Sequence, residues 1–177
     1  TCALPISTKG ERSQLYISNH RDIILDAAIL NILMLLNKRE TVEIAIGDNL
    51  LIIPWVADIV RLNKSFIVKR NLPIKQLLEN INHLSSYISH TVIERNQSIW
   101  IAQREGRAKD ANDRTQISVL KMLSLYNKNN PLEALKDLNI VPISISYEYD
   151  PCDYLKAKES QMKRDDPDHK KTFFDDV

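Results

Sequence analysis

His20, Asp22 and Asp26 are the residues of this 177-residue chain whose types and spacing best suit proton transfer. An imidazole titrates near neutral pH and can take a proton from a hydroxyl, and a neighbouring carboxylate fixes its tautomer and stabilises the imidazolium. The polar pair Ser18-Asn19 precedes His20, and an apolar stretch with helical character follows over 23–36. The sequence therefore predicts a histidine general base with a carboxylate partner.

The spacing of these residues determines where the helix must begin. Residues six apart on a continuous α-helix are separated by about 240° around its axis, so His20 and Asp26 would not share a face. They converge only if His20 lies in the turn before the helix, which Ser18-Asn19 and the N-cap candidate Asp22 favour. We expect Asp26 to be the partner, because Asp22 suits the cap, and Asp22 is the alternative.

The segment Asn19-His20-Arg21, followed by an aspartate among apolar residues, resembles the first motif of the glycerol-3-phosphate and lysophosphatidate acyltransferases. Four residues separate the histidine and the aspartate in that family, whereas Asp26 lies one residue further along. Either the turn absorbs one residue, or Asp22 serves instead. The resemblance implies that His20 deprotonates the acceptor hydroxyl and that Asp26 holds the imidazole.

A predicted strand over 65–70 ends in the basic pair Lys69 and Arg70, and it resembles the second family motif. The resemblance implies that the pair holds the phosphate of the acceptor. A dianionic phosphate in a cleft needs fixed positive charge, and arginine offers a planar bidentate fork. By itself, a basic pair at a strand end more often lies in solvent.

An apolar segment over 98–103 predicts a buried strand, and a charged loop follows it directly. This arrangement resembles the third family motif, which implies substrate-binding roles for Glu105, Gly106 and Arg107. Glu105 would hold the acceptor hydroxyl or support the base, Gly106 would let the backbone turn sharply, and Arg107 would bind phosphate. Open α/β sheets bind ligands at the carboxyl ends of their strands, which favours the functional interpretation of this loop.

The last predicted strand, over 139–149, carries Val141-Pro142 and resembles the fourth motif, which lines the acyl pocket in that family. Its Tyr147-Glu148 ending is closest to the glycerol-3-phosphate branch. Proline cannot donate a ladder hydrogen bond, so we expect this strand to lie at an edge of the sheet or to begin irregularly. The four motifs occur in family order over about 15–159.

Strands and helices alternate along the chain, which predicts an α/β fold with a mostly parallel central sheet and helices on both faces. We expect an acyltransferase-like domain over 13–164, preceded by an unstructured start or fragment end over 1–12. A polar and mobile end is expected over 165–177. The helix over 22–37 has apolar residues nearly all round and is expected to be buried. The run over 50–62 predicts a buried helix or, alternatively, an acyl-chain wall or membrane-facing surface.

Composition excludes several classes of function. The net charge of +1 gives no general electrostatic attraction to nucleic acid, and three glycines form neither a phosphate loop nor a dinucleotide fingerprint. Cys2 and Cys152 lie too far apart to suggest metal ligation, so we expect no metal and no cofactor. The chain has no apolar run of about 20 residues. Because the product lipid enters a bilayer, the resemblance implies peripheral association with the cytoplasmic side of a membrane surface.

Taken together, the resemblance implies an O-acyltransferase of phospholipid synthesis. The donor would be an acyl thioester of acyl carrier protein or coenzyme A, and the acceptor a hydroxyl of glycerol-3-phosphate or 1-acylglycerol-3-phosphate. The alternative is a catalytically silent lipid- or phosphate-binding module with the same fold. The extra residue before Asp26, and Ala108 where the family has serine, support that alternative. The distance between His20 and Asp26 distinguishes the two.

Overall fold

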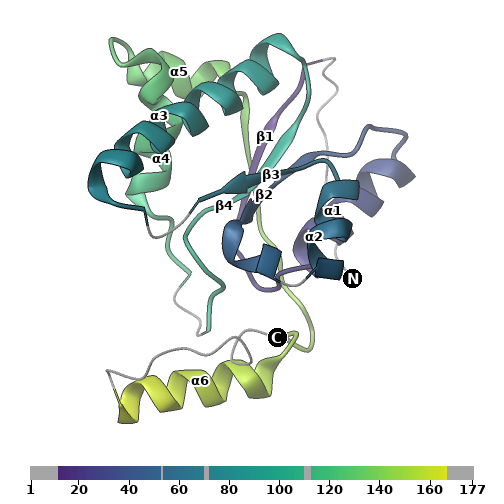
Figure 1. Ribbon diagram of the computed structural model, residues 1–177. Coiled ribbons are helices and arrows are strands. Elements are labelled where there is room, and N and C mark those ends of the chain that lie inside the picture. Colours follow the sequence, from purple (N-terminus) through teal and green to yellow (C-terminus); the bar gives the residue numbers. More distant parts are fainter. Residues whose placement is uncertain (1–11, 53, 70–71, 110–112, 167–177) are drawn as a thin grey trace.

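The computed structural model describes residues 12–52, 54–69, 72–109 and 113–166, and these contain one sheet of five parallel strands. The strands lie in the order β3-β2-β4-β1-β5, with every pairing parallel (Figure 1). Their bounds are β1 (Leu15–Ser18), β2 (Glu43–Gly47), β3 (Ser65–Val68), β4 (Ile99–Ala102) and β5 (Ile140–Ile143). The predicted α/β fold with a mostly parallel sheet is confirmed. Pro142 lies on β5, an edge strand, as its missing N–H group requires.

Helices connect the strands on both faces of the sheet. Their bounds are α1 (Leu25–Leu36), α2 (Pro54–Leu62), α3 (Ile74–Ser89), α4 (Ile117–Ser124), α5 (Pro131–Asp137) and α6 (Asp153–Asp165). Right-handed crossovers place α1 and α2 on one face and α3, α4 and α5 on the other, as Figure 1 shows. The helix α6 follows the last strand and lies beyond the carboxyl ends of the strands. None of the helices in the described part of the chain combines the length and the hydrophobicity that a membrane span requires.

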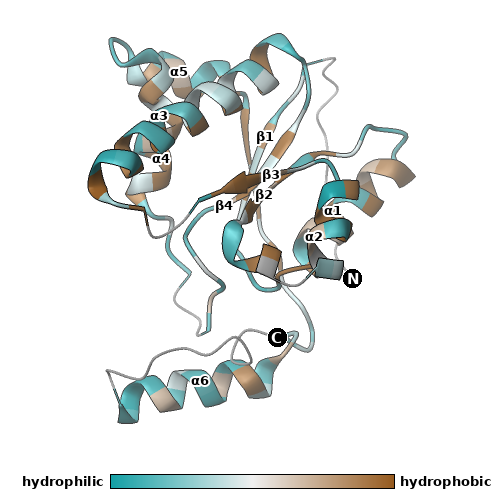
Figure 2. Cartoon of the chain, viewed as in Figure 1, coloured by the Kyte–Doolittle hydropathy of each residue, from teal (hydrophilic) through white to brown (hydrophobic). Residues whose placement is uncertain are grey.

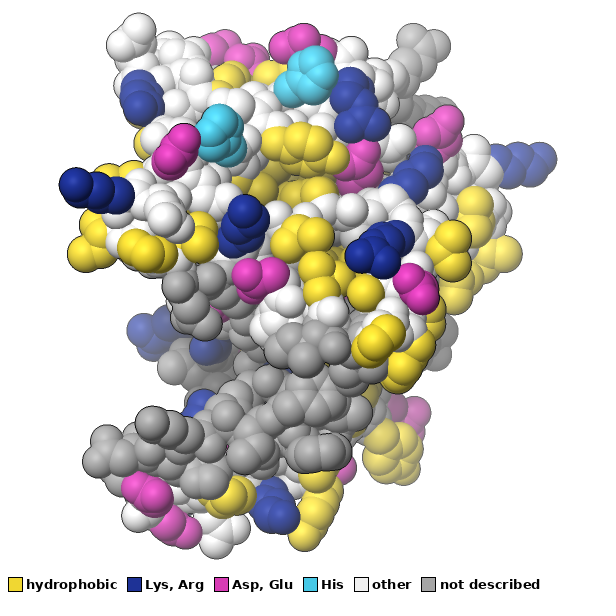
Figure 3. Space-filling model, in the orientation of Figure 1, with side chains coloured by type: hydrophobic (Ala, Val, Ile, Leu, Met, Phe, Trp, Pro, Cys, Tyr) yellow, Lys and Arg dark blue, Asp and Glu magenta, His cyan; other side chains and the backbone are white. Residues whose placement is uncertain are grey.

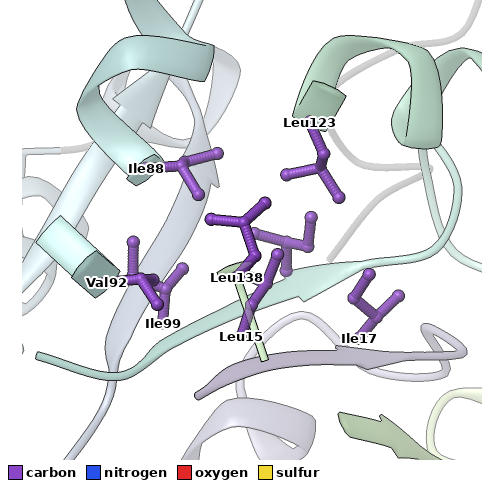
Figure 4. Packing of buried hydrophobic residues seen from close by; sticks show 8 residues of the cluster. Leu15, Ile17, Ile88, Val92, Ile99, Leu123 and Leu138 are labelled. Carbon is purple, nitrogen blue, oxygen red and sulfur yellow. The ribbon is translucent and has the colours of Figure 1, made fainter. Parts of the chain in front are cut away.

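Successive strand residues point to opposite faces, so the sheet has two separate hydrophobic cores. Figure 4 shows the aliphatic core under α3 and α4. It consists of Leu15, Ile17, Ile88, Val92, Ile99, Ile101, Leu123 and Leu138. The core under α1 includes aromatic rings, and it consists of Tyr16, Ala27, Leu30, Met34, Val42, Ile44 and Trp100. Figure 2 shows the hydrophobic strands between more polar helices.

The prediction that the helix over 22–37 is buried nearly all round is wrong. Leu30 and Met34 pack in the core, whereas Leu35 and Leu36 on the opposite side are exposed. The helix packs against one face of the sheet, so only one of its own faces meets the strands. The run over 50–62 is likewise only partly buried.

Several expected bounds differ from the observed ones. The expected segments 1–12 and 165–177 lie almost entirely outside the described residues, and Arg70 lies outside them too. The last strand ends at Ile143, six residues earlier than expected, because the chain then turns to hydrogen-bond with Asn19.

Candidate active site

The turn that carries His20 is fixed on three sides at the carboxyl end of β1. The Asn19 side chain pairs with the backbone N–H and carbonyl of Ile145 at 2.7 and 2.8 Å. The Gln103 N–H, just after β4, donates to the Ser18 carbonyl at 2.7 Å, and the Ala108 N–H donates to the His20 carbonyl at 2.8 Å. Segments after β1, β4 and β5, far apart in sequence, therefore meet around one histidine.

His20 and Asp26 are within hydrogen-bond distance, with 2.9 Å between His20 Nδ1 and Asp26 Oδ2. Asp22 instead stabilises the turn before the helix, since its Oδ1 accepts the N–H groups of Ile24 and Leu25 at 2.9 and 2.8 Å, while the N-cap position itself is Ile24. These bonds stabilise a turn before α1, which begins only at Leu25. The additional residue relative to the family pattern is thus absorbed in the turn, and Asp26 enters the helix facing His20.

The Asp26 carboxylate is buried and accepts four hydrogen bonds. Besides His20, its Oδ2 accepts the backbone N–H groups of Arg21 and Asp22 at 2.7 and 3.0 Å, and its Oδ1 accepts the Tyr147 hydroxyl at 2.8 Å. Burial by itself would raise the pKa of Asp26, but these hydrogen bonds, led by that of His20, outweigh it and hold the pKa below its ordinary value. The group is therefore ionised at neutral pH.

An ionised Asp26 determines how the His20 ring works. A carboxylate only accepts hydrogen bonds, so Nδ1 carries the proton and Nε2 of the neutral imidazole keeps a lone pair. Trp100 packs against the ring edge to face, with centroids 5.9 Å apart at 72°, and its own N–H donates to Ser18 Oγ at 2.9 Å. The ring is thus oriented from two sides, as a general base requires.

A cavity of about 520 Å³ opens beside His20, and four cationic side chains contribute to its wall. Glu105, Gly106 and Arg107 line it, as the third motif predicts for a substrate-binding loop. Arg104, Lys109 and Lys163 line it as well, so four cations and one carboxylate surround it among the described residues. Gly106 has φ of +73°, a backbone conformation that glycine adopts without strain. The cavity suits an anionic ligand that presents a hydroxyl to His20.

A second cavity, of about 510 Å³, lies on the α3 and α4 face and is mainly apolar. Its walls include Phe66, Leu77, Ile88 and Met122. It adjoins the first cavity at five shared residues: Ala45, Gly47, Ala102, Arg104 and Glu105. The two cavities therefore meet at the carboxyl ends of β2 and β4.

The structure brings together five of the seven predicted site residues. His20, Asp26, Glu105, Gly106 and Arg107 surround or support the cationic cavity. Lys69 lines the apolar cavity and not the cavity beside His20, and Arg70 lies outside the described residues. Strand β3 is an edge strand next to β2, which places its end farther from His20 than the end of β4.

Tyr147, Trp100 and Lys163 are site residues that the sequence analysis did not find. The Tyr147–Asp26 bond spans 121 residues, and no local pattern in a single sequence indicates it. The only signal was the Tyr-Glu ending of the fourth motif. In the described part of the chain, no three His, Cys, Asp or Glu side chains are arranged to hold a metal ion.

Comparison with known families agrees with the four motifs. The family model described as Acyltransferase matches residues 6–146, which include all five strands and end just before Tyr147. A search of curated proteins finds no match. The family match covers most of the chain and confirms the resemblance drawn from the motifs. The chain belongs to the Acyltransferase family.

Proposed function

We propose that this protein transfers a fatty acyl group from an acyl thioester to a hydroxyl of glycerol-3-phosphate or 1-acylglycerol-3-phosphate. The donor is acyl carrier protein or coenzyme A. The observation that carries this proposal is the pairing of His20 with the buried Asp26, at 2.9 Å, beside a cavity with four cationic side chains that adjoins an apolar cavity. The family match supports acyl transfer. The cationic side chains of one cavity are consistent with a phosphate group, and the apolar wall of the other is consistent with a fatty chain.

The proposed reaction is a direct transfer without an acyl-enzyme. His20 Nε2 takes the proton of the acceptor hydroxyl as its oxygen attacks the thioester carbonyl carbon. Asp26 stabilises the imidazolium that forms. The tetrahedral intermediate then collapses, the C–S bond breaks, and the leaving sulfur takes the proton from His20. General base catalysis of this kind contributes roughly 10²–10⁴-fold, and positioning of the two substrates supplies more.

In this proposal Arg107 binds the phosphate of the acceptor and Glu105 orients its hydroxyl. Both line the cavity beside His20, where a charge-assisted bidentate contact is possible. Lys69 lines the adjoining cavity together with Glu105, so it approaches the acceptor from the far side. We therefore expect Lys69 to contribute less than Arg107 to binding of the acceptor phosphate.

The fatty chain of the donor fits the apolar cavity in this proposal. Phe66, Leu77 and Met122 offer a wall from which water is excluded when a chain is bound. The resemblance implied an acyl pocket along the last strand, and the run over 50–62 was an alternative acyl-chain wall. We propose the apolar cavity between the sheet and the helices α3 and α4 in place of both.

We also propose peripheral association with the cytoplasmic side of a membrane surface through α1 and α2. Figure 3 shows hydrophobic side chains gathered over these helices. Ile32 and Leu36 share one face of α1, and Trp55, Ile59 and Leu62 share one face of α2, and all five are exposed. We expect cosedimentation with anionic vesicles that Trp55→Ser with Leu62→Ser weakens at least threefold. Equal cosedimentation of the variant would contradict the proposal.

The function is tested by thiol release from a long-chain acyl thioester. We expect release to depend on glycerol-3-phosphate or on its 1-acyl derivative, and to be lost in His20→Ala. A chromogenic disulfide reagent follows the released thiol, and thin-layer chromatography of labelled lipid identifies the product. If neither acceptor stimulates release, yet the protein binds them, the silent binding module becomes the better explanation.

A further inference from the structure

The C-terminal helix α6 lies beyond the residues that the family model matches, yet it is bound to the active site. Lys156, Glu159 and Lys163 are spaced three and four residues apart, so they share one face of this helix. That face points toward the His20 turn and the Arg107 loop, as their contacts show. In this chain, α6 therefore forms part of the site's wall.

Lys156 connects the first half of α6 to the catalytic turn. Its side chain is only 4% exposed, and Nζ donates to the Arg21 carbonyl at 2.6 Å and to Asp150 Oδ2 at 2.9 Å. The Arg21 guanidinium donates to the same Asp150 carboxylate at 3.0 and 3.2 Å. Since Arg21 follows His20 directly, this cluster fixes the position of α6 relative to the base.

Glu159 connects the middle of α6 to the loop of the third motif. It is equally buried, and it pairs with Lys109 in that loop and with Lys163 one helical turn further along, at 3.1 Å. Removing a buried carboxylate from between two cations is costly, because their charges would lose compensation. This second cluster therefore fixes α6 close to the cavity.

Lys163 lines the cavity from α6, opposite the sheet that forms its floor. Its side chain is 46% exposed, so the ammonium group is accessible from the cavity while Glu159 holds it in place. Lysine offers three donors on a flexible stem, which suits the oxygens of a phosphate monoester. A cation on this wall would contact an anion that Arg107 binds from the loop.

We infer that α6 completes the acceptor site and that Lys163 binds the phosphate group of the acceptor. This inference rests on the proposed function for the class of acceptor. The helix α6 lies outside the matched family region. The inference gives this helix the role of discriminating between a phosphorylated acceptor and an uncharged one. Lys156 and Glu159 do not contact the acceptor in this inference. Their ion pairs hold in place the helix that carries Lys163.

The test compares Lys163→Ala with Lys158→Ala in the full-length chain. Lys158 is exposed on the opposite face of α6, so its variant loses the same charge from the same helix. For Lys163→Ala we expect the KM for glycerol-3-phosphate to rise about tenfold, which corresponds to about 1.4 kcal/mol. The kcat and the KM for the acyl donor should change less than twofold, and Lys163→Arg should retain most of the wild-type affinity.

Calorimetric titration of glycerol-3-phosphate, without donor, separates this inference from the proposed function. Wild-type binding that weakens about tenfold in Lys163→Ala, but not in Lys158→Ala, supports the inference whether or not acyl transfer is seen. Equal affinities in the two variants overturn it, even if the wild-type enzyme transfers acyl groups. If the wild type shows no acceptor-stimulated thiol release, the proposed function is overturned, and the inference on Lys163 is not.

Discussion

The two faces of the sheet use the same strands for different purposes. On the α3 and α4 face the strands contribute aliphatic side chains, and the adjoining cavity is apolar. On the α1 face the strands contribute Tyr16 and Trp100, and four cations and one carboxylate line the adjoining cavity. Because strand side chains alternate between the faces, the same strand ends border an apolar cavity and a charged one.

The two faces of the sheet should also respond differently to side-chain substitutions. On the α1 face, four hydrogen bonds converge on one buried carboxylate, and each has a defined direction. On the other face the contacts are non-directional, and their value scales with buried apolar area. We therefore expect substitutions at the first face to reduce catalysis and substitutions at the second to reduce stability.

The largest expected effect is that of His20→Ala on the α1 face. Loss of the general base should lower the acceptor-dependent kcat by about 10²–10⁴-fold, while the thermal midpoint changes little, because three other donors still satisfy Asp26. Steady-state thiol release and a thermal melt measure both quantities. His83→Ala, on the exposed side of α3, is the matched control and should behave as wild type.

The opposite pattern is expected for Leu123→Ala on the α3 and α4 face. Leu123 is fully buried in the aliphatic core, so its truncation should cost about 2–5 kcal/mol of unfolding free energy. Urea unfolding measures this loss, and kcat measured well below the midpoint should stay within about threefold of wild type. A fall in kcat as large as that of His20→Ala would show that the faces are not separable.

For Tyr147→Phe we expect a smaller loss of unfolding free energy, and this loss should depend on pH. The hydroxyl bonds to a buried carboxylate, so its removal should cost about 1.5–3 kcal/mol of stability near neutral pH. The pKa of Asp26 is lower in the folded chain than its ordinary value of 3.8, so this stabilisation is present above that value and is lost as pH falls through the folded pKa. Urea unfolding at several pH values between 7 and 3 tests this.

The outcome for Tyr147→Phe also refines its assignment as a positioning residue. A purely structural role predicts loss of stability with an unchanged pH profile of kcat/KM. A positioning role predicts a shift of the acidic limb of that profile, where the general base becomes protonated, because Asp26 and His20 are coupled by a hydrogen bond. A difference in stability that does not decrease as pH falls through the folded pKa of Asp26 would contradict the assigned bond.

Much of the fold follows from the sequence, because short apolar strands that alternate with amphipathic helices admit few topologies. The edge position of the last strand followed from Pro142, and the hydrogen bond between His20 and Asp26 followed from cap chemistry at Asp22. The exposure of Leu35 and Leu36 could not be predicted, because hydrophobicity alone does not show which faces of a helix another element covers. The roles of Tyr147 and Lys163 depend on long-range contacts that no local spacing encodes.

The attachment of α6 and of Tyr147 has a consequence for the order in which the site assembles. The contacts of Asp26 with Tyr147 and of Arg21 with Lys156 close loops of 121 and 135 residues. Closing such loops costs chain entropy that the contact must offset, so we expect both contacts to form late in folding. A nascent chain that ends before Tyr147 already contains His20, Asp26 and Trp100, yet it lacks the Tyr147 hydroxyl and the Lys156 ammonium group. The set of contacts around the His20 turn is therefore complete only when nearly the whole chain is present.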